Sequence, residues 1–300
     1  MIKNLLLMLL LLGVAHAHAV DVTDSLGRHQ FDRPPQRIIT LNWAATEQVV
    51  ELGVTPLAVA DAAGYRQWVA QPALPDQVRD VGLRQEPNLE NIAELNPDLI
   101  ITGDQQGDLV ARLQQIAPVL HFENFSRDHN NAEAARAGFL QLARALHREA
   151  EAVQRLAELD ATFAQLRQRL HRHFGDHLPP VAVTRLMDSS HVRVYGDNSM
   201  PQYALERLGI APALPQPASQ WGQVQKKLTD LGALRQGALL YIEPFPGADQ
   251  LFGTPLWRAL PVVRAGQVAA VRPTWTYGGI MSLGYLAENL TDALLSIDPE

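Results

Sequence analysis

The chain has 300 residues, of which 47% are hydrophobic, and a formal net charge of −7. It is long enough for one large domain or two smaller lobes. Only three residues are lysine and no basic block occurs, which excludes nucleic acid as the expected partner. The absence of cysteine excludes disulfides, thiolate metal sites, cysteine nucleophiles and a lipid anchor on cysteine.

The N-terminus is typical of a secretory signal peptide. Lys3 precedes an apolar run, Leu5–Val14, and small residues follow it. The run is shorter than the roughly 20 residues that cross a bilayer, so an uncleaved anchor is the weaker alternative. We expect residues 1–19 to be removed near Ala17 or Ala19 and the mature protein to lie in the periplasm. Secretion to the medium is the other possibility.

The next segment alternates strand and helix patterns. A polar hairpin comes first, and then apolar runs bounded by Gly and Pro alternate with helical periodicity. This alternation predicts a parallel sheet wrapped by helices. The expected strands are 37–42, 55–61, 97–102 and 117–123, and the expected helices are 46–53, 88–95 and 109–116.

Residues 132–174 show no strand pattern. Apolar side chains recur there at spacings of three and four, which predicts one apolar face on a long helix. They are Leu156, Leu159, Phe163, Leu166 and Leu170. We expect a break near 146–148 and a connecting helix over residues 147–176, of which about 25 helical residues would span some 37 Å.

The alternation resumes after residue 177, where three segments echo the first half in the same order. EQVVELGVTP is echoed by QYALERLGIAP, NLENIAELNPDLIIT by KLTDLGALRQGALLYI, and ARLQQIAPVLHF by WRALPVVRAGQVAAV. The fold class we expect is α/β, with two Rossmann-like lobes, residues 20–146 and 177–300, joined by a single long α-helix. A cleft between the lobes would collect the loops at the strand ends.

Loops at the predicted strand ends carry aromatic side chains that a turn does not need. For any single ring, the alternative is a place in the hydrophobic core at the end of a sheet. Trp257 lies within a predicted helix, and we expect its ring to be in the core. Because such rings occur at corresponding ends of both lobes, we expect them to line one cleft. They are Trp43, Tyr65, Trp68, Trp221, Trp275 and Tyr277.

Arg84 lies in the turn of DVGLRQEPN, before the helix at 88–95. A guanidinium presents a planar fork of donors that suits paired oxygens. The alternatives are a solvated turn residue and a partner for Glu86. An aromatic cleft with one arginine fits a ligand that is largely apolar or weakly polar and carries acceptor oxygens on one face.

The segments PQRIITLNWAATEQVVELGVTPLAVADAAGYRQWV and VGLRQEPNLENIAELNPDLII resemble the periplasmic binding proteins for iron–siderophore complexes and vitamin B12. YRQWV, VYGDNSM, TPLWRALPVVRAGQV and WTYGG resemble the members that bind ferric hydroxamates. The resemblance extends from about Val22 to the C-terminus. It implies a receptor of an ABC importer that captures ferric siderophores, and it implies that Arg84 donates to hydroxamate oxygens around Fe(III).

The resemblance also implies that the siderophore saturates the iron, so no protein metal ligand and no cofactor are expected. Where the family carries a tyrosine after PDLII, this chain has Gln106, which can still donate to the ligand. The resemblance implies that a carboxylate on each lobe docks to arginines of the membrane permease, which acts together with its ATPase. Glu90 (or Asp108) and Asp230 are the candidates, although surface carboxylates near helix N-termini are common.

Other functions remain open on the sequence. His171, His173 and His177 could indicate a zinc receptor, but no histidine-rich loop accompanies them. No nucleophile elbow, His-Glu-x-x-His motif or phosphate loop occurs, so we expect no enzyme. A catecholate siderophore, cobalamin or haem would be alternative ligands. The hydroxamate is preferred over the catecholate because a strongly anionic catecholate chelate calls for several basic residues and a hydroxamate chelate for only one. We expect a monomer.

Overall fold

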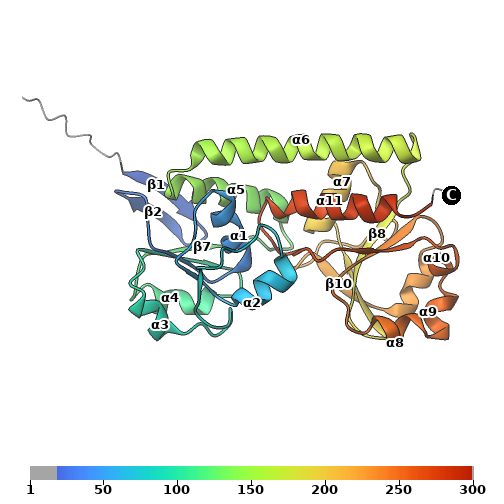
Figure 1. Cartoon of the computed structure of the whole chain (residues 1–300), viewed down its shortest axis with the longest axis horizontal. Helices are drawn as coiled ribbons and strands as arrows, with labels where there is room; N and C mark the ends of the chain where they lie inside the picture. The colour runs from blue at the N-terminus through green and yellow to red at the C-terminus, as the bar shows by residue number, and fades with distance from the viewer. Residues whose placement is uncertain (1–18, 299–300) are drawn as a thin grey trace, which may run out of the picture.

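The computed structural model describes residues 19–298 and shows two α/β lobes side by side beneath one long helix (Figure 1). The predicted signal peptide falls almost entirely on residues 1–18, outside the described residues. Within residues 19–298, no helix has both the length and the apolar character needed to cross a membrane.

The first lobe holds a five-stranded sheet in the order β5-β4-β3-β6-β7, in which all neighbours are parallel, and a separate hairpin of β1 and β2. The parallel pairing confirms the expectation from the alternating pattern. The strands are β1 (Val20–Asp24), β2 (Gly27–Phe31), β3 (Ile38–Thr40), β4 (Ala58–Val59), β5 (Arg79–Asp80), β6 (Leu99–Gly103) and β7 (Val119–Phe122). The helices are α1 (Trp43–Glu51), α2 (Ala62–Gly64), the π-helix η1 (Tyr65–Val69), α3 (Leu89–Glu94), the 3₁₀ turn η2 (Gly107–Leu109) and α4 (Val110–Leu113).

The second lobe repeats this strand order as β10-β9-β8-β11-β12, but its sheet is mixed. A four-residue turn joins β8 to β9, too short for a crossover helix, so β9 runs antiparallel to β8 and β10 runs antiparallel to β9. The strands are β8 (Val181–Leu186), β9 (His191–Tyr195), β10 (Gln223–Lys227), β11 (Ala238–Ile242) and β12 (Val268–Val271). The helices are α7 (Met200–Leu208), the 3₁₀ helix η3 (Leu228–Ala233), α8 (Ala248–Phe252), α9 (Pro255–Ala259), α10 (Pro261–Arg264) and α11 (Ser282–Leu295).

Two helices connect the lobes. The chain leaves the first sheet through α5 (Asn131–Ala145), turns at His147 with a left-handed φ of 53°, and continues as α6 (Glu149–Phe174). The predicted break and the predicted apolar face are confirmed, because all five leucine and phenylalanine positions of that face are buried. α6 therefore spans both lobes, as Figure 1 shows.

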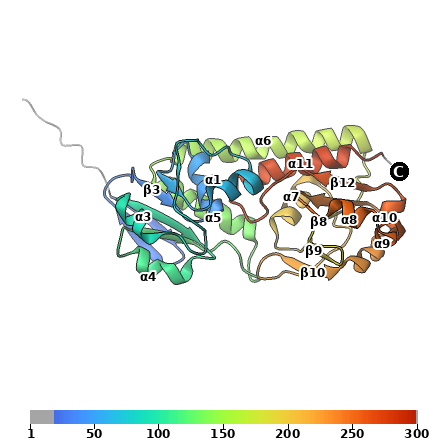
Figure 2. The same cartoon turned by 60° about the horizontal axis from the view of Figure 1, so that its bottom comes forward.

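A single cluster of buried side chains runs through both lobes on the side of α6. It contains residues of β3 and α1 from the first lobe, of β8 and α7 from the second, and of α5, α6 and α11. Figure 2 shows α11 lying along α6 over the second lobe, and the two helices are in contact. On the faces of the two sheets that point away from α6, each lobe has a core of its own. The lobes are therefore not joined by a common core on that side, and the cleft lies there.

Candidate functional site

Two adjoining cavities, of about 270 and 330 Å³, lie between the lobes. Both are lined by Arg84, Arg193, Trp275 and Tyr277, so they form one cleft. The first cavity is completed by Asn42, Asp104, Gln105, Phe125, Trp221 and Gln223. The second is completed by Trp43, Trp68, Arg185, Leu186, Met187, Pro244, Phe245 and Pro246.

The turn after β5 presents Arg84 to the cleft. A bridge between Gly82 and Pro87 closes this turn, and Gly82 has a φ of 95° that favours glycine. The guanidinium carbon of Arg84 lies 3.6 Å from the ring centre of Trp43 and 5.5 Å from that of Trp275. Its side chain is 15% exposed, which rules out the alternative of a solvated turn residue.

Arg84 keeps unused donors. Its Nε lies 3.6 Å from the Oδ2 atom of Asp61, beyond hydrogen-bond distance, and no other described residue accepts from it. Burial lowers the pKa of Arg84 and the Asp61 carboxylate opposes that shift, so the group remains cationic at neutral pH. A ligand oxygen entering the cleft can therefore complete its hydrogen bonding.

Aromatic rings from both lobes form a continuous row beside this cation. Trp43 meets Trp275 edge to face at 4.8 Å between ring centres, and Trp275 lies 5.4 Å from Tyr277. Tyr277 in turn lies 6.3 Å from Trp221 and 5.5 Å from Phe125. These spacings are those of favourable aromatic pairs. The structure thus brings four of the six predicted rings into contact around Arg84, one of them from the first lobe.

Two of the tryptophans differ in detail from expectation. Trp221 does line the cleft and is 37% exposed, but it lies in the loop before β10 and not at a strand-to-helix junction, because the second lobe replaces a crossover with a hairpin. Trp68 lines the second cavity only, where the guanidinium carbon of Arg185 lies 5.5 Å from its ring centre. Trp257 is buried in α9, which confirms its predicted place in the core.

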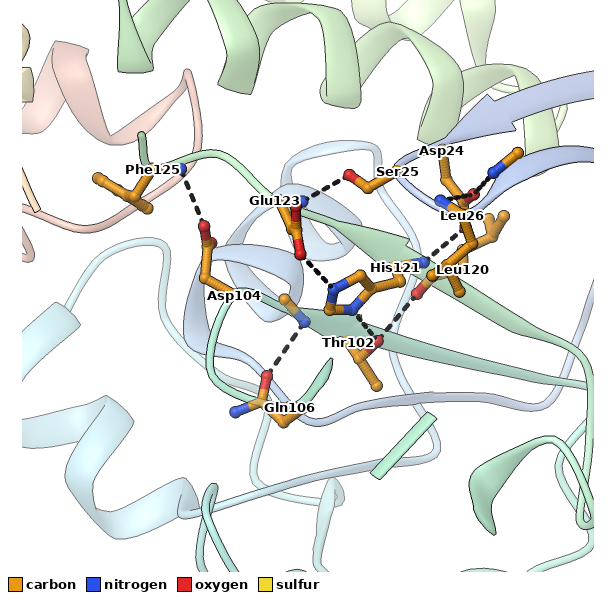
Figure 3. A network of polar contacts seen from close by, with 12 residues as sticks. Asp24, Ser25, Leu26, Thr102, Asp104, Gln106, Leu120, His121, Glu123 and Phe125 are labelled. Atoms are coloured by element: carbon orange, nitrogen blue, oxygen red, sulfur yellow. Dashed lines mark hydrogen bonds and ion pairs between the residues drawn. The ribbon is translucent and has the colours of Figure 1, made fainter. Parts of the chain in front are cut away.

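The predictions of direct contact by Tyr65 and Gln106 are wrong. The side chain of Tyr65 is 0% exposed and its hydroxyl donates to the carbonyl oxygen of Pro72, so it supports the site from behind. Gln106 is also 0% exposed, and its Oε1 accepts from the amide of Gly103 (Figure 3). Its Nε2 donates to the carbonyl oxygen of Arg84 at 3.2 Å, so Gln106 positions the Arg84 turn.

Gln105 and Asp104, the residues before Gln106, line the first cavity instead. Asp104 accepts from the amide of Phe125 at 2.9 Å, and Figure 3 shows its carboxylate directed at that amide. Burial raises the pKa of Asp104, while hydrogen bonds from the backbone oppose that shift. Sequence reasoning missed both residues because it assigned the ligand-facing role of this loop to its next position.

Two arginines of the second lobe were also missed, so the expectation of one arginine in the cleft is wrong. Arg185 comes near the end of the apolar run VAVTRL, where a charged residue in a buried strand was an available signal. Arg193 alternates with buried residues of β9, which is typical of a solvent-facing position. Burial raises the pKa of Tyr277 to about 12, and the charges of Arg193 and Arg185 oppose that shift.

The loop that carries Trp275 and Tyr277 also packs on the first lobe. A Cβ on Gly278 would come within 2.6 Å of the Glu47 carboxylate, and one on Gly279 within 2.5 Å of the Gln48 side chain. Only glycines allow this approach. The two rings are therefore fixed relative to α1, although their loop belongs to the second lobe by sequence.

Within residues 19–298, no group of three or more His, Cys, Asp or Glu side chains is placed to hold a metal ion. His171 Nδ1 lies 3.0 Å from the carbonyl oxygen of Gly175, and His173 packs edge to face against Phe174. These contacts give both histidines a role at the end of α6. No grouping in the described chain favours the zinc alternative.

The docking candidates Glu90, Asp108 and Asp230 are exposed, in α3, η2 and η3 respectively. Asp230 accepts from the backbone amide of Lys227 at 3.1 Å and so caps η3. Its carboxylate thus has a local structural role, as surface carboxylates near helix N-termini often do.

Known proteins share both the sequence pattern and the fold. The periplasmic binding protein family pattern matches residues 38–274. The chain belongs to the periplasmic binding protein family. It is 33% identical to the iron(3+)-hydroxamate-binding protein FhuD of Escherichia coli over 94% of this chain and 90% of that protein. It is 30% identical to the achromobactin-binding periplasmic protein of Dickeya dadantii, over 85% of each.

Among solved structures of the family, FhuD of Vibrio cholerae with Fe³⁺–Desferal bound has a TM-score of 0.87 and 46% identity. The match covers 88% of this chain and 99% of that one. Members of this family bind substrates for transport and are not enzymes, which confirms the expectation of a non-enzymatic protein. The match in fold confirms the expectation of two lobes joined by a long helix.

Proposed function

We propose that this chain is the periplasmic receptor of an ABC importer that captures ferric siderophores, in particular tris-hydroxamate chelates, and delivers them to an inner-membrane permease. The observation that carries the proposal is the position of Arg84, a largely buried cation among aromatic rings from both lobes. The relatives that are named for iron(3+)-hydroxamate and Fe³⁺–Desferal binding support the ligand class.

The chemistry of such a chelate suits this cleft. Three hydroxamates supply six oxygens and satisfy the hard ferric ion, so the protein needs no metal ligand. The core is roughly neutral, yet its oxygens accept hydrogen bonds, which Arg84 can donate. Trp275, Tyr277 and Trp221 would contact the hydrocarbon linkers of the siderophore. Contacts of this kind tolerate variation between ligands.

Delivery requires a surface for the permease. Glu90 and Asp230, one exposed carboxylate on each lobe, are the proposed docking residues, with Asp108 as the alternative in the first lobe. The receptor would act as a monomer after removal of the signal peptide. Its working parts would be the proposed lobes 20–146 and 177–300 and the connecting segment 147–176.

A catecholate siderophore is the second candidate. Arg185 and Arg193 bring the number of arginines that line the cleft to three, and several cations suit a strongly anionic chelate. The hydroxamate proposal ranks first because of the relatives' ligands and because the first cavity, which Arg185 does not line, sets Arg84 and Arg193 beside the carboxylate of Asp104.

Titration monitored by tryptophan fluorescence tests the proposal, because four tryptophans line the cleft. Ferrichrome, an iron(III) tris-catecholate, haem and cobalamin would each be added to the purified mature protein, with the iron-free hydroxamate as the control. We expect saturable quenching by the ferric hydroxamate at the lowest concentration. Tighter binding of the catecholate, haem or cobalamin would contradict the proposed ligand class, and no quenching by any of them would contradict the receptor function.

A further inference from the structure

The second cavity carries a net positive lining. Three of its lining residues are arginines, Arg84, Arg185 and Arg193, and among the described residues that line it none is Asp or Glu. The rest of its lining is largely apolar and includes Trp68, Met187 and Phe245. Unpaired charges beside apolar walls are unfavourable unless a ligand compensates them.

Arg185 and Arg193 lie directly opposite each other on the antiparallel strands β8 and β9. Paired residues of an antiparallel ladder point to the same face, and like charges at such positions destabilise the sheet. Neither guanidinium has a carboxylate within ion-pair distance in the part of the chain that the structure describes, whereas Arg84 faces Asp61. The two arginines are therefore placed together at the expense of sheet stability.

The hydrogen bonding of the two arginines leaves donors free. Arg185 is 8% exposed and donates only to the carbonyl oxygens of Glu243 and Thr274, at 3.4 and 3.2 Å. Arg193 is partly exposed, and its guanidinium makes no hydrogen bond to another described residue within residues 19–298. A guanidinium pair with free donors forms a fork that matches the two oxygens of a carboxylate.

We propose that the Arg185–Arg193 pair binds a carboxylate that the siderophore carries outside its iron-chelating groups. This inference rests on the proposed function and narrows it to hydroxamate siderophores with a free acidic end. The chelate core would lie at Arg84, and a hydrocarbon arm would follow Trp68, Met187 and Phe245 to the arginine pair. A carboxylate at the end of a hydrocarbon arm suits this cavity better than the iron-bound oxygens of an anionic chelate would. The apolar walls can pack against the arm, whereas they offer no hydrogen bonds to iron-bound oxygens.

Three probes of the same chelate test the proposal. The ferric complex of Desferal has a terminal primary amine that can be left free, acetylated or succinylated, which gives a cationic, a neutral and an anionic end on one iron-binding core. Fluorescence titration of the mature protein measures the affinity for each. We expect the succinylated complex to bind about tenfold more tightly than the acetylated one, as one charge-assisted hydrogen bond provides, and the free amine to bind most weakly.

Arg193→Gln removes one charge from the partly exposed side of the pair and is expected to reduce the succinyl-to-acetyl affinity ratio to about one. Arg258→Gln, on the exposed face of α9 and outside both cavities, makes the same change in net charge and should keep the ratio. A ratio of about one in the unmodified protein would overturn the proposal, as would a ratio that Arg193→Gln leaves intact.

The outcomes also separate this proposal from the proposed function. Equal, saturable binding of all three Desferal complexes would overturn the carboxylate site and leave the receptor function standing. No binding of any of them would overturn both. If an iron(III) tris-catecholate binds more tightly than the succinylated complex and Arg193→Gln abolishes that advantage, the pair recognises the charge of the chelate itself, and the proposal is overturned.

Discussion

Replacing Arg84 by alanine tests the physical basis of the site. The substitution removes a cation that stacks at 3.6 Å on Trp43, lines both cavities and donates no side-chain hydrogen bond to another described residue. It also leaves the Asp61 carboxylate without the guanidinium at 3.6 Å, so the local charge changes from near balanced to negative.

The expected loss follows from these contacts. A hydrogen bond to a charged group contributes a net amount of about 1.5–3 kcal/mol, which corresponds to about a ten- to hundredfold loss of affinity. The Asp61 carboxylate, left without its cation, would add repulsion toward chelate oxygens. Arg84→Lys keeps the charge but loses the planar fork, so we expect an intermediate affinity.

Fluorescence titration with ferrichrome measures both variants against the unmodified protein, and urea unfolding checks that each is folded. Arg66→Ala, an exposed arginine of η1 outside both cavities, is a matched control. An affinity of folded Arg84→Ala within twofold of the unmodified protein would refute the assigned role, because even one lost charge-assisted hydrogen bond exceeds that change.

Three further predictions concern buried groups. Gln106→Ala leaves the buried amide of Gly103 unpaired, so the free energy of unfolding in urea should fall by about 1–3 kcal/mol. The substitution also removes the hydrogen bond to the carbonyl oxygen of Arg84, so ferrichrome affinity should fall as well. Unchanged affinity would show that Gln106 does not position Arg84. Phe163→Ala leaves a cavity in the core that both lobes share, so the free energy of unfolding should fall by about 3–5 kcal/mol. Urea unfolding should still show one common transition, with a lower midpoint. Two separate transitions would contradict a shared core. Burial and the neighbouring Glu51 raise the pKa of Glu47 well above 4.5, so the folded protein binds the Glu47 proton more tightly than the unfolded chain does, and its stability falls as the pH rises above 4.5. Glu47→Gln removes this titration, so its thermal midpoint should exceed that of the unmodified protein by a margin that grows from pH 4 to pH 8. A margin that stays constant with pH would contradict the raised pKa.

Much of the fold was predictable because it follows from periodicity. The five apolar positions between Leu156 and Leu170 repeat at helical spacing, and all of them are buried on α6. The three sequence echoes correspond to α1 and α7, to α3–β6 and η3–β11, and to α4–β7 and α9–β12. The sequence did not reveal that β9 runs antiparallel, because this depends on a four-residue turn that resembles any other polar loop.

The site was predictable where a residue type is unusual for its position. Arg84 and the tryptophans stood out because neither a turn nor a loop requires them, and the structure places Arg84 against two of these rings. Tyr65, at the start of the π-helix η1, and Gln106, in the turn before η2, were wrongly assigned to the cleft, because a one-residue difference there decides whether a side chain faces the cleft or the core. Arg193 was missed because alternation along a strand does not distinguish a wet cleft from the outer surface.

The glycine pair Gly278–Gly279 has a consequence for how a ligand could leave. These residues abut Glu47 and Gln48 of the first lobe, while Thr274 and Thr276 of the same loop hydrogen-bond to Arg185 and Tyr195 of the second. The segment bearing Trp275 and Tyr277 is therefore anchored to both halves, so a wide opening would have to break one of these anchorages, and cargo is expected to enter and leave with only a small change in the angle between the halves.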